Sequence, residues 1–580
     1  MSRFLLSLLA LGLNCSVPSL RAQPGLAAAA LSGALPPAAT EELPRLTPRQ
    51  VEHVAALGQV WGFLKYFHPA VAGGQRDWDA ELLRQLPLVL ACRSEAECSR
   101  LLSTWITGLG PVPACPACAV PPTKPVRLAP DLRWAWNAKR FSAPLRQQLA
   151  FIEANRYQGA PYYVTQNGSN TVFPHEEAYA DQACPTPGLR LLALCRYWNM
   201  LQYYYPYPYT WNEDWSDVLT DLLPRFAEAT TPLAYRHAAL ALFARVHDGH
   251  ARFYPPDPLL EAERGAYQVA ADVQFLDDQA VVVRVRRDGL VPPPPLAPGD
   301  ILTHLAGTSV AALVKQRLPE TGASNRAAQL NTIALNLLYC ATPQLAVRVV
   351  RAGRPLRLVA PAVKVGAVPP VAPAVADSMY RFLTPDVGYV DMARIKANKL
   401  AVIMKAFAHT KGIVVDQRNY PGDFVATEMP GFFLARPVPF AKFTQRDPNY
   451  PGRFVWFPAD TIKPVGPAPY TGQVVVLVNE VSRSAAEFTA MALRATPHAT
   501  LLGSQTAGAD GNSTRITLPG DLKTLMTGLG VYYPDGRETQ RVGLVPDVLV
   551  RPTIAGLRAG HDELRDRAVE LITRAPAVVR

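Results

Sequence analysis

One junction in the chain combines residue types that could carry out nucleophilic chemistry. Residues 474–478 are all apolar and predict a buried strand, a polar turn follows over 479–483, and a helix pattern begins at Ser484. The first turn of a helix presents free backbone N–H groups and a partial positive charge. A serine at that place could attack a carbonyl carbon, and the N–H groups would stabilise the resulting oxyanion. Ser484 is therefore the candidate nucleophile.

The same residues also fit a purely structural interpretation. Ser484 followed three residues later by Glu487 is the pattern of a capping box, in which the two side chains satisfy free N–H groups of the first turn. Most serines in this pattern are only caps. The two interpretations are compatible, because a capping serine can also react, and the surrounding sequence has to decide between them.

A serine hydroxyl needs a positioned base to act as a nucleophile near neutral pH. No lysine occurs between Ser484 and Lys523, and Lys523 lies beyond the Gly-rich loop, in an expected strand. The candidate base is His250, in the segment DGHARF, because histidine titrates in the range that this task requires. A histidine near a helix end can also serve only to bind the last carbonyl groups.

The elements around this junction alternate between strands and helices. Further strands are expected over 387–391, 412–415 and 500–502, and a Gly-rich loop follows over 508–512. The strand at 412–415 runs into the polar turn QRNYPG. Such a turn at the carboxyl end of a strand can offer backbone N–H groups to an anion, although it also fits an ordinary loop.

The N-terminal third contains a diverged repeat. QVWGFLKYFHPA from residue 59 aligns with RYWNMLQYYYPY from residue 196, so that Trp61 matches Trp198 and Pro69 matches Pro206. Each copy predicts an aromatic amphipathic helix ended by proline, followed by a shorter helix. Aromatic residues at this spacing are usually core, so we expect two helical packing units. A carbohydrate- or cell-wall-binding surface formed by the repeat is the alternative.

Residues 265–362 are rich in short expected strands, with the segment LAPGDILTHLAG in their middle and a helix pattern over 327–338. This order resembles a PDZ domain, a family in which the C-terminus of a peptide adds as a strand to a sheet edge. A small β domain without a ligand groove is the alternative.

Composition limits the remaining classes. The chain has 580 residues, 49% of them hydrophobic, and a net charge of +11 with its lysines and arginines scattered, so we expect several globular domains and no nucleic-acid partner. Residues 1–23 resemble a secretory signal, which predicts a periplasmic or secreted protein. Lipidation at Cys15 is not expected, and no later stretch is long enough to span a membrane.

Seven cysteines would remain after removal of the signal, and export would allow disulfides between them. We expect a bond between Cys92 and Cys98. Cys115 and Cys118, in the segment CPAC, favour a local disulfide over a zinc site because the histidines and regular spacing of a zinc site are missing nearby. No metal and no organic cofactor are expected.

Four motifs in order point to one family. KGIVVDQRNYPG, VVLVNEVSRSAAEF, GSQTAGADGN and PDGRETQRVGLVPDV resemble the S41 peptidases, the C-terminal-processing and tricorn-core-like serine proteases. The resemblance covers roughly residues 240–575. It implies a ClpP/crotonase-like α/β catalytic domain interrupted by a PDZ domain, and the N-terminal helical repeat resembles an extra domain of some bacterial members.

The resemblance also assigns roles. It implies that Ser484 is the nucleophile, with Ser482 as the lesser candidate, and that the oxyanion donors are the N–H groups of Gly422 and Ala485. The lysine base of the processing branch is replaced here by Ala509, so a Ser–Lys dyad is excluded.

The tricorn-like branch uses a histidine instead, and its position falls on His250. The serine that precedes this histidine in that branch is replaced by Gly249. The branch also has a glutamate shortly before its GxxPD motif. Gln540 fills that place, with Glu538 nearby, so one of these two would orient the histidine.

The expected protein is a multidomain α+β, exported serine endopeptidase that acts on peptides or unfolded proteins, with the PDZ-like domain selecting C-termini. A catalytically inactive peptide-binding protein on the same fold stays open as an alternative. The expected parts are a signal peptide over 1–23, a disordered linker over 24–45, an N-terminal helical repeat domain over 46–250, a PDZ-like β domain over 265–362, a linker over 363–378 and a catalytic domain over 379–575.

Overall fold

The structure is a computed structural model that describes residues 43, 45–287, 292–367, 379–466 and 468–574. The expected signal peptide at 1–23 lies outside these residues, as do nearly all of the expected linker at 24–45 and residues 368–378 of the second linker. Among the helices in the described part of the chain, none combines the length and the apolar character that a bilayer crossing requires.

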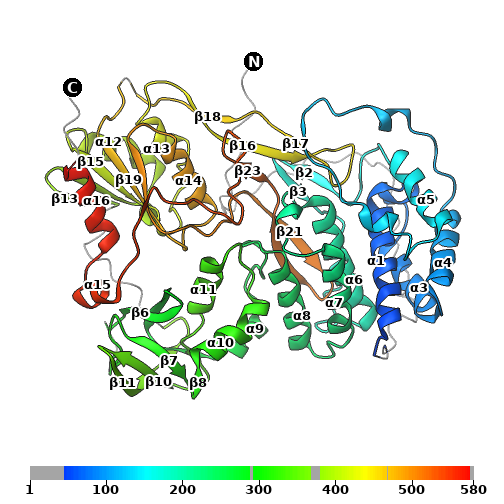
Figure 1. Cartoon of the computed structure of the whole chain (residues 1–580), viewed down its shortest axis with the longest axis horizontal. Helices are drawn as coiled ribbons and strands as arrows, with labels where there is room; N and C mark the ends of the chain where they lie inside the picture. The colour runs from blue at the N-terminus through cyan, green and yellow to red at the C-terminus, as the bar shows by residue number, and fades with distance from the viewer. Residues whose placement is uncertain (1–42, 44, 288–291, 368–378, 467, 575–580) are drawn as a thin grey trace, which may run out of the picture.

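A layer of helices forms the N-terminal region, which is drawn in blue to green on the right of Figure 1. The sequence prediction of a helical N-terminal region is confirmed. Its main helices are α1 (Pro48–Phe67), α3 (Trp78–Ala91), α4 (Glu95–Gly108), α5 (Ala143–Ala154), α6 (Pro187–Tyr204), α7 (Trp215–Ala227) and α8 (Pro232–Arg245).

The two copies of the repeat share one packing device. In the first copy the indole N–H of Trp61 donates to the Trp78 carbonyl at 2.7 Å, and the Trp78 indole donates back to the Trp61 carbonyl at 2.9 Å. In the second copy Trp198 and Trp215 exchange the same two bonds, at 2.6 and 3.1 Å. Trp61 and Trp198 are 0% exposed, so neither can stack on a glycan, and these tryptophans do not form the carbohydrate-binding surface that was considered as an alternative.

The C-terminal part of the chain completes this helical core. The hairpin of β21 (Ser513–Leu518) and β22 (Leu522–Thr527) places Ile516, Leu518 and Met526 in the same apolar cluster as the helices. The segment after α8 runs along the hairpin, where Tyr254 N–H donates to the Lys523 carbonyl at 3.0 Å. The residues that follow α8 are thereby fixed against β22.

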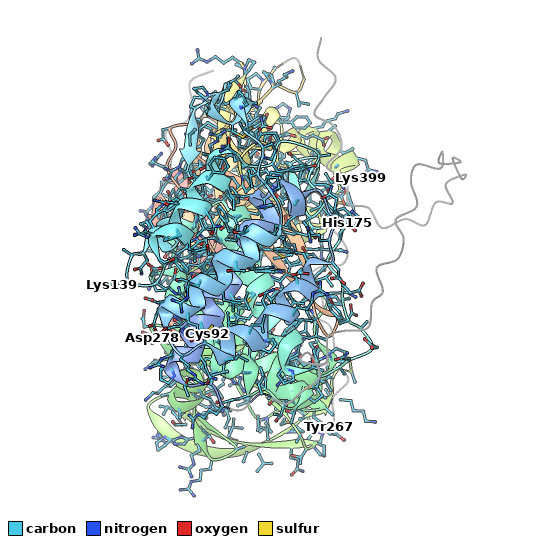
Figure 2. The ribbon with its side chains drawn as sticks, turned by 90° about the vertical axis from the view of Figure 1, so that its right-hand side faces the viewer. Cys92, Lys139, His175, Tyr267, Asp278 and Lys399 are labelled. Atoms are coloured by element: carbon cyan, nitrogen blue, oxygen red, sulfur yellow. A yellow bond between two sulfur atoms is a disulfide. The ribbon has the colours of Figure 1, made fainter. Side chains whose placement is uncertain are left out.

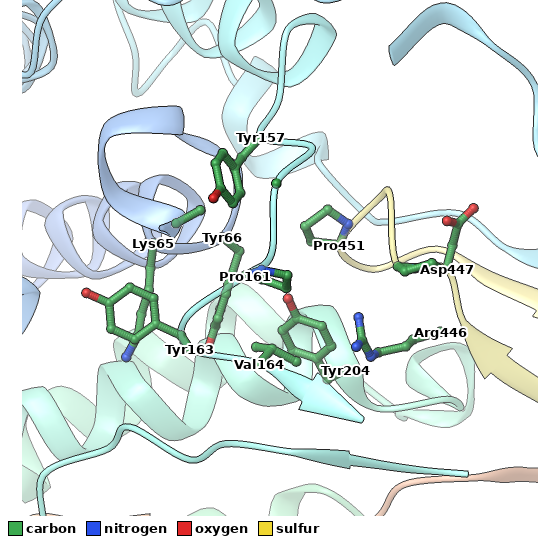
Figure 3. A pocket seen from close by; sticks show the side chains of 13 residues that line it. Lys65, Tyr66, Tyr157, Pro161, Tyr163, Val164, Tyr204, Arg446, Asp447 and Pro451 are labelled. Carbon is green, nitrogen blue, oxygen red and sulfur yellow. The ribbon is translucent and has the colours of Figure 1, made fainter. Parts of the chain in front are cut away.

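A second set of strands connects the two halves of the chain. The strand order is β1 (Val126–Leu128), β17 (Phe454–Trp456), β16 (Val438–Arg446) and β18 (Asp460–Ile462), and β23 (Gly530–Tyr532) also pairs with β16. Figure 3 shows a small pocket beside this connection, lined by Lys65, Tyr66, Tyr163, Tyr204 and Arg446 among others. None of the predicted site residues lines it.

The middle region is an antiparallel sheet with its own apolar core, drawn in green at the bottom of Figure 1. Its strand order is β11 (Arg354–Pro361), β10 (Gln344–Arg351), β7 (Ile301–Leu305), β6 (Gln279–Val285) and β5 (Ala271–Leu276). Helices α10 (Val310–Arg317) and α11 (Arg326–Ala334) accompany the sheet, and α11 packs beside the edge strand β5. The sequence prediction of short strands in this region is confirmed, and the helix pattern expected over 327–338 corresponds to α11.

The last region is a mostly parallel sheet with helices on both faces, on the left of Figure 1. The strand order is β13 (Tyr380–Thr384), β14 (Val387–Asp391), β15 (Gly412–Asp416), β19 (Gln473–Val478), β20 (Ala499–Gly503) and β24 (Val548–Leu549), and only the β13–β14 pair is antiparallel. Val474, Val476 and Val478 face the core shared with α12 (Leu400–Ala406) and α14 (Ala485–Arg494). Val475 and Leu477 face α16 (Glu563–Arg574).

Cys115 and Cys118 form a disulfide, which confirms that CPAC is a local bridge. Cys92 and Cys98 are free thiols, so the expectation of a bond between them is wrong for this structure. Cys92, labelled in Figure 2, ends α3, and its thiol donates to the Leu88 carbonyl at 3.4 Å. Burial raises the pKa of both thiols, that of Cys98 to about 12, and a thiol that stays protonated is slow to oxidise.

Candidate active site

Ser484 lies at the junction of β19 and α14 in a strained backbone conformation. Its φ is 53° and its ψ is −119°, a region that residues with a Cβ rarely adopt. Such strain costs about 1–3 kcal/mol and persists only where the surrounding structure holds it, typically at functional sites. Ser484 is half-buried, whereas residues 474–478 of the strand before it are buried. The junction therefore holds this side chain at the boundary of the core.

Glu487 holds the strained turn in place. Its carboxylate is fully buried and accepts hydrogen bonds from Ser484 N–H at 3.1 Å, Gly508 N–H at 2.7 Å, Ala509 N–H at 2.9 Å and the Thr506 hydroxyl. Burial raises the pKa of Glu487, and these four donors offset part of that effect. The glutamate thus joins the turn before α14 to the Gly-rich loop after β20, beyond its expected role in a capping box.

The hydroxyl of Ser482 is fully occupied in the turn. It donates to the Gln417 carbonyl at 2.8 Å and accepts from Asn479 N–H at 3.1 Å, and the residue is 0% exposed. Gln417 directly follows β15, so this serine ties together the carboxyl ends of two neighbouring strands. Ser482 has a structural role here, which leaves Ser484 as the serine of this turn that is available for chemistry.

The two expected oxyanion donors differ in whether their N–H groups are free to bind an oxyanion. In the described part of the chain, Ala485 N–H has no acceptor, as expected for the first residue of a helix. Gly422 N–H donates to the Met392 carbonyl at 2.9 Å, so in this conformation it is not free to bind an oxyanion. A Cβ at Gly422 would lie 2.8 Å from the Ile395 carbonyl oxygen, which explains why this turn needs glycine.

His250 is buried, with its side chain 8% exposed. Its ring Nδ1 lies 2.9 Å from the hydroxyl of Thr527, at the end of β22, and 3.4 Å from Oδ1 of Asp248. Asp248 is 0% exposed and also accepts from the N–H groups of His250 at 3.0 Å and Thr527 at 2.7 Å. The histidine ring is therefore held at its Nδ1 side, and Nε2 is the nitrogen left for another partner.

The segment of His250 lies against the turn of Ser484. A Cβ at Gly249 would lie 2.8 Å from Cβ of Ala509 and 3.6 Å from Nε of Arg483, which precedes Ser484. Glycine at 249 and alanine at 509 thus allow two backbone segments to approach closely. Within the described residues, no hydrogen bond joins Ser484 to His250 in this conformation.

The middle region contributes to the same place. Gly249 N–H donates to the Ser324 hydroxyl at 2.8 Å, just before the start of α11. The Asn325 side chain, which caps α11, donates to the Thr506 carbonyl at 2.8 Å. The N-terminus of α11 is therefore bonded both to the residue before His250 and to the loop that Glu487 holds.

Gln540 and Glu538, the two expected orienting groups, lie in different surroundings. Glu538 forms an ion pair with Arg127 at 2.8 Å, within an aromatic group that includes Tyr209 and Tyr532. Gln540 is fully buried, and its amide donates to the Tyr205 hydroxyl at 3.2 Å and to Asp248 Oδ1 at 3.5 Å. Of the two, only Gln540 reaches the surroundings of His250, and it does so through Asp248.

Sequence reasoning assigned no role to Asp248 or Thr527. Asp248 stands two residues before the predicted base, and this spacing is the feature of the sequence from which a role for Asp248 could have been predicted. Thr527 lies 277 residues from His250 along the chain, in a hairpin that had no visible connection to the N-terminal helices. Among the described residues there is no group of three or more His, Cys, Asp or Glu side chains that could hold a metal ion.

Comparison with known proteins gives one family. Residues 386–550 match the model of peptidase family S41. The carboxy-terminal-processing protease of Bartonella bacilliformis (strain ATCC 35685 / KC583 / Herrer 020/F12,63) is 34% identical over 90 residues, which are 15% of this chain and 20% of that protein. The match therefore spans a fifth of the length of this curated relative.

Crystal structures of mature CPAF are similar in fold. One superimposes with a TM-score of 0.52 and 14% identity, covering 68% of this chain and 99% of CPAF. A complex of mature CPAF with lactacystin gives a TM-score of 0.51 and 13% identity, covering 68% and 100% of the two chains. At this identity the likeness shows a shared fold and no more. The match to the model of peptidase family S41 covers residues 386–550, the part of the chain that contains Ser484.

Proposed function

We propose that this chain is a serine peptidase in which Ser484 attacks the peptide carbonyl and His250 takes and returns the proton. The observation that carries the proposal is the strained position of Ser484 at a helix N-terminus whose first N–H, that of Ala485, has no acceptor among the described residues. Ser484 Oγ would form a bond to the carbonyl carbon, and His250 would pass the serine proton to the leaving amine as the C–N bond breaks. Water would then hydrolyse the acyl-enzyme, with His250 again acting as the base, and release the acid.

The oxyanion of the tetrahedral intermediate would lie at the N-terminus of α14, bound by Ala485 N–H. A second donor at Gly422 requires that its N–H leave the Met392 carbonyl, which is 2.9 Å away. A shift of the RNYPG turn when substrate binds would free it. The proposal needs neither a metal ion nor an organic cofactor.

The middle region would select the substrate. It has the strand order and the helix beside an edge strand that suit the addition of a peptide as a further strand, here along β5 and next to α11. The N-terminus of α11 contacts the residue before His250 through Ser324, so a bound peptide tail would lie on an element connected to the catalytic residues. The signal-like residues 1–23 favour an exported enzyme acting on peptides or unfolded proteins outside the cytoplasm.

The direct test is digestion of an unfolded protein library by the wild type and by Ser484→Ala, with the cut sites mapped by mass spectrometry. We expect cuts by the wild type, none by Ser484→Ala, and wild-type cutting by Ser103→Ala, a matched control whose hydroxyl bonds to Gln148 in the N-terminal helices. A wild type that cuts nothing but retains peptide tails would instead favour the inactive binding protein on the same fold.

A further inference from the structure

We infer that Asp248 is the carboxylate that positions His250, both directly and through the hydroxyl of Thr527, and that Gln540 serves to hold Asp248. The inference rests on the proposed function, because it concerns the step in which His250 takes the proton of Ser484. It moves the orienting charge from the region of residues 538–540 to a position two residues before the histidine.

The hydrogen bonds of Asp248 fix both of its oxygens. Oδ2 accepts from Thr527 N–H at 2.7 Å, and Oδ1 accepts from His250 N–H and from the Thr527 hydroxyl, both at 3.0 Å. Gln540 adds a longer contact to Oδ1 at 3.5 Å. A carboxylate with 0% exposure and this many donors cannot turn, so it offers His250 a charge of fixed position.

The same bonds decide which ring nitrogen of His250 carries the proton. The Thr527 hydroxyl has one hydrogen, and it points to Asp248 Oδ1, an acceptor without a proton of its own. The oxygen of Thr527 is then an acceptor toward His250 Nδ1, 2.9 Å away, so Nδ1 must hold the ring hydrogen. Nε2 therefore keeps its lone pair, which is the state that a general base requires.

The charges around Asp248 agree with an ionised carboxylate. Burial raises the pKa of Asp248, but its hydrogen bond and charge interaction with the His250 ring, together with the bonds from the two backbone N–H groups, outweigh burial, and the pKa is lowered overall. The phenols of Tyr197 and Tyr205 stay protonated because burial and this negative charge raise their pKa values. The positive charge of Arg483 also interacts with the negative charge of Asp248.

Two further charged groups lie close to this site. Arg252 donates to the Gly249 carbonyl at 3.0 Å, which places a second cation beside the segment of His250. Glu487 is turned toward Ser484 N–H and the loop at 506–509, where it is fully engaged. Arg252 has no carboxylate and the carboxylate of Glu487 is directed elsewhere, so neither group orients the His250 ring in place of Asp248.

Position 540 fits this arrangement because it holds an amide. A glutamate at 540 would place a second negative charge about 3.5 Å from Asp248, and two such carboxylates cannot both stay ionised at low cost. The Gln540 amide instead donates a hydrogen to Asp248 and to the Tyr205 hydroxyl. Glutamine at position 540, where the family resemblance predicts glutamate, is thus compatible with the negative charge of Asp248.

The test combines kinetics with the state of the ring in the full-length protein. Asp248→Asn should lower kcat by roughly 10³- to 10⁴-fold, the scale known for loss of an orienting aspartate, and move the acid limb of the kcat/KM–pH profile to lower pH. Thr527→Val should lower kcat by about tenfold, the value of one hydrogen bond, and Thr527→Ser should restore it. Asp447→Asn, which removes another buried carboxylate bonded to Arg453, should leave both kcat and the pH profile unchanged.

Nitrogen-15 NMR of labelled histidines reports the tautomer without using activity, with the His250 signal assigned by its loss in His250→Gln. We expect the hydrogen on Nδ1 in the wild type and a mixed tautomer in Asp248→Asn. A wild-type ring with its hydrogen on Nε2, or a folded Asp248→Asn with wild-type kcat, would overturn the inference. If Asp248→Asn does not fold, the inference is tested by the tautomer of the wild-type ring and by the kcat values of Thr527→Val and Thr527→Ser. If the wild type cleaves nothing, the proposed function fails, while the NMR spectrum still tests whether Asp248 and Thr527 set the tautomer of His250.

Discussion

At the scale of single residues, the main feature of the candidate site is the positive φ of Ser484, which Glu487 holds in place. The strand, the polar turn and the spacing of Ser484 and Glu487 were enough to place a serine at a helix start. The positive φ depends on Glu487, which reaches across to Gly508 and Ala509, and a contact across a loop of that kind has no local signature. The full role of Asp248 could not be predicted either, because it depends on a contact with Thr527, which lies far along the chain.

The strain at Ser484 predicts an unusual order of stabilities. Glycine adopts this φ and ψ freely, whereas alanine keeps the Cβ that causes the strain. Ser484→Gly should therefore be more stable than Ser484→Ala by about 1 kcal/mol, after the larger chain entropy of glycine is subtracted from the relieved strain. Urea unfolding of the two inactive variants measures the difference, and a less stable glycine variant would show that the backbone is unstrained.

Asp510 predicts a pH dependence of folding. It is 2% exposed, its Oδ2 has no partner among the described residues, and burial and the charge of Glu487 raise its pKa well above the usual value. A group whose pKa is raised on folding binds its proton more tightly in the folded state. Stability therefore falls as the pH rises from the unfolded value of about 3.9 toward the raised pKa.

Asp510→Asn removes this titration, so the variant should lose less stability than the wild type over that pH range. Urea unfolding measured at several pH values tests the expectation. Parallel stability curves for the two proteins would mean that Asp510 titrates alike in both states.

At the scale of elements, the parallel strands and the strands of the middle region could be predicted because each is a short apolar or alternating run between turn residues. The prediction of Gly422 as a free donor could not foresee that its N–H bonds to the Met392 carbonyl. Likewise, no pattern in the sequence indicated that the start of α11 would contact the segment of His250, since Ser324 and Gly249 lie 75 residues apart and in different expected domains.

That contact gives a prediction for Ser324→Ala. The change leaves Gly249 N–H buried without a partner, which costs about 1–3 kcal/mol and loosens the segment that carries His250. We expect kcat to fall several-fold with the Ser484 turn intact, and Ser309→Ala, which removes the N-cap hydroxyl of α10 in the same region, to leave kcat unchanged. Steady-state kinetics on one peptide substrate tests it, and equal kcat values for both variants would contradict the coupling.

At the scale of the whole molecule, the internal repeat and the helical N-terminal region followed from the aromatic pattern. The sequence did not indicate how the regions pack against one another. The hairpin β21–β22 belongs to the C-terminal part of the chain but packs in the N-terminal core, and this brings Thr527 to Asp248. Such long-range packing depends on shape and on burial that no local pattern records.

The repeat predicts that its two copies respond alike to the same change. Trp61→Phe and Trp198→Phe each remove one buried indole hydrogen bond to the carbonyl of a helix-starting tryptophan, so each should lower the stability by about 1 kcal/mol. The pH profile of cleavage should stay that of the wild type. Denaturant unfolding of both variants measures the costs, and a large effect in only one copy would show that the repeat is not equivalent in packing.

The central claim is that Ser484 is an activated nucleophile, and labelling with a fluorophosphonate followed by mass spectrometry of the modified peptide tests it most directly. We expect one label per chain on Ser484, none in Ser484→Ala, and labelling slowed by several orders of magnitude in His250→Ala. A folded wild type that takes no label, or takes it on Ser482, would contradict the account.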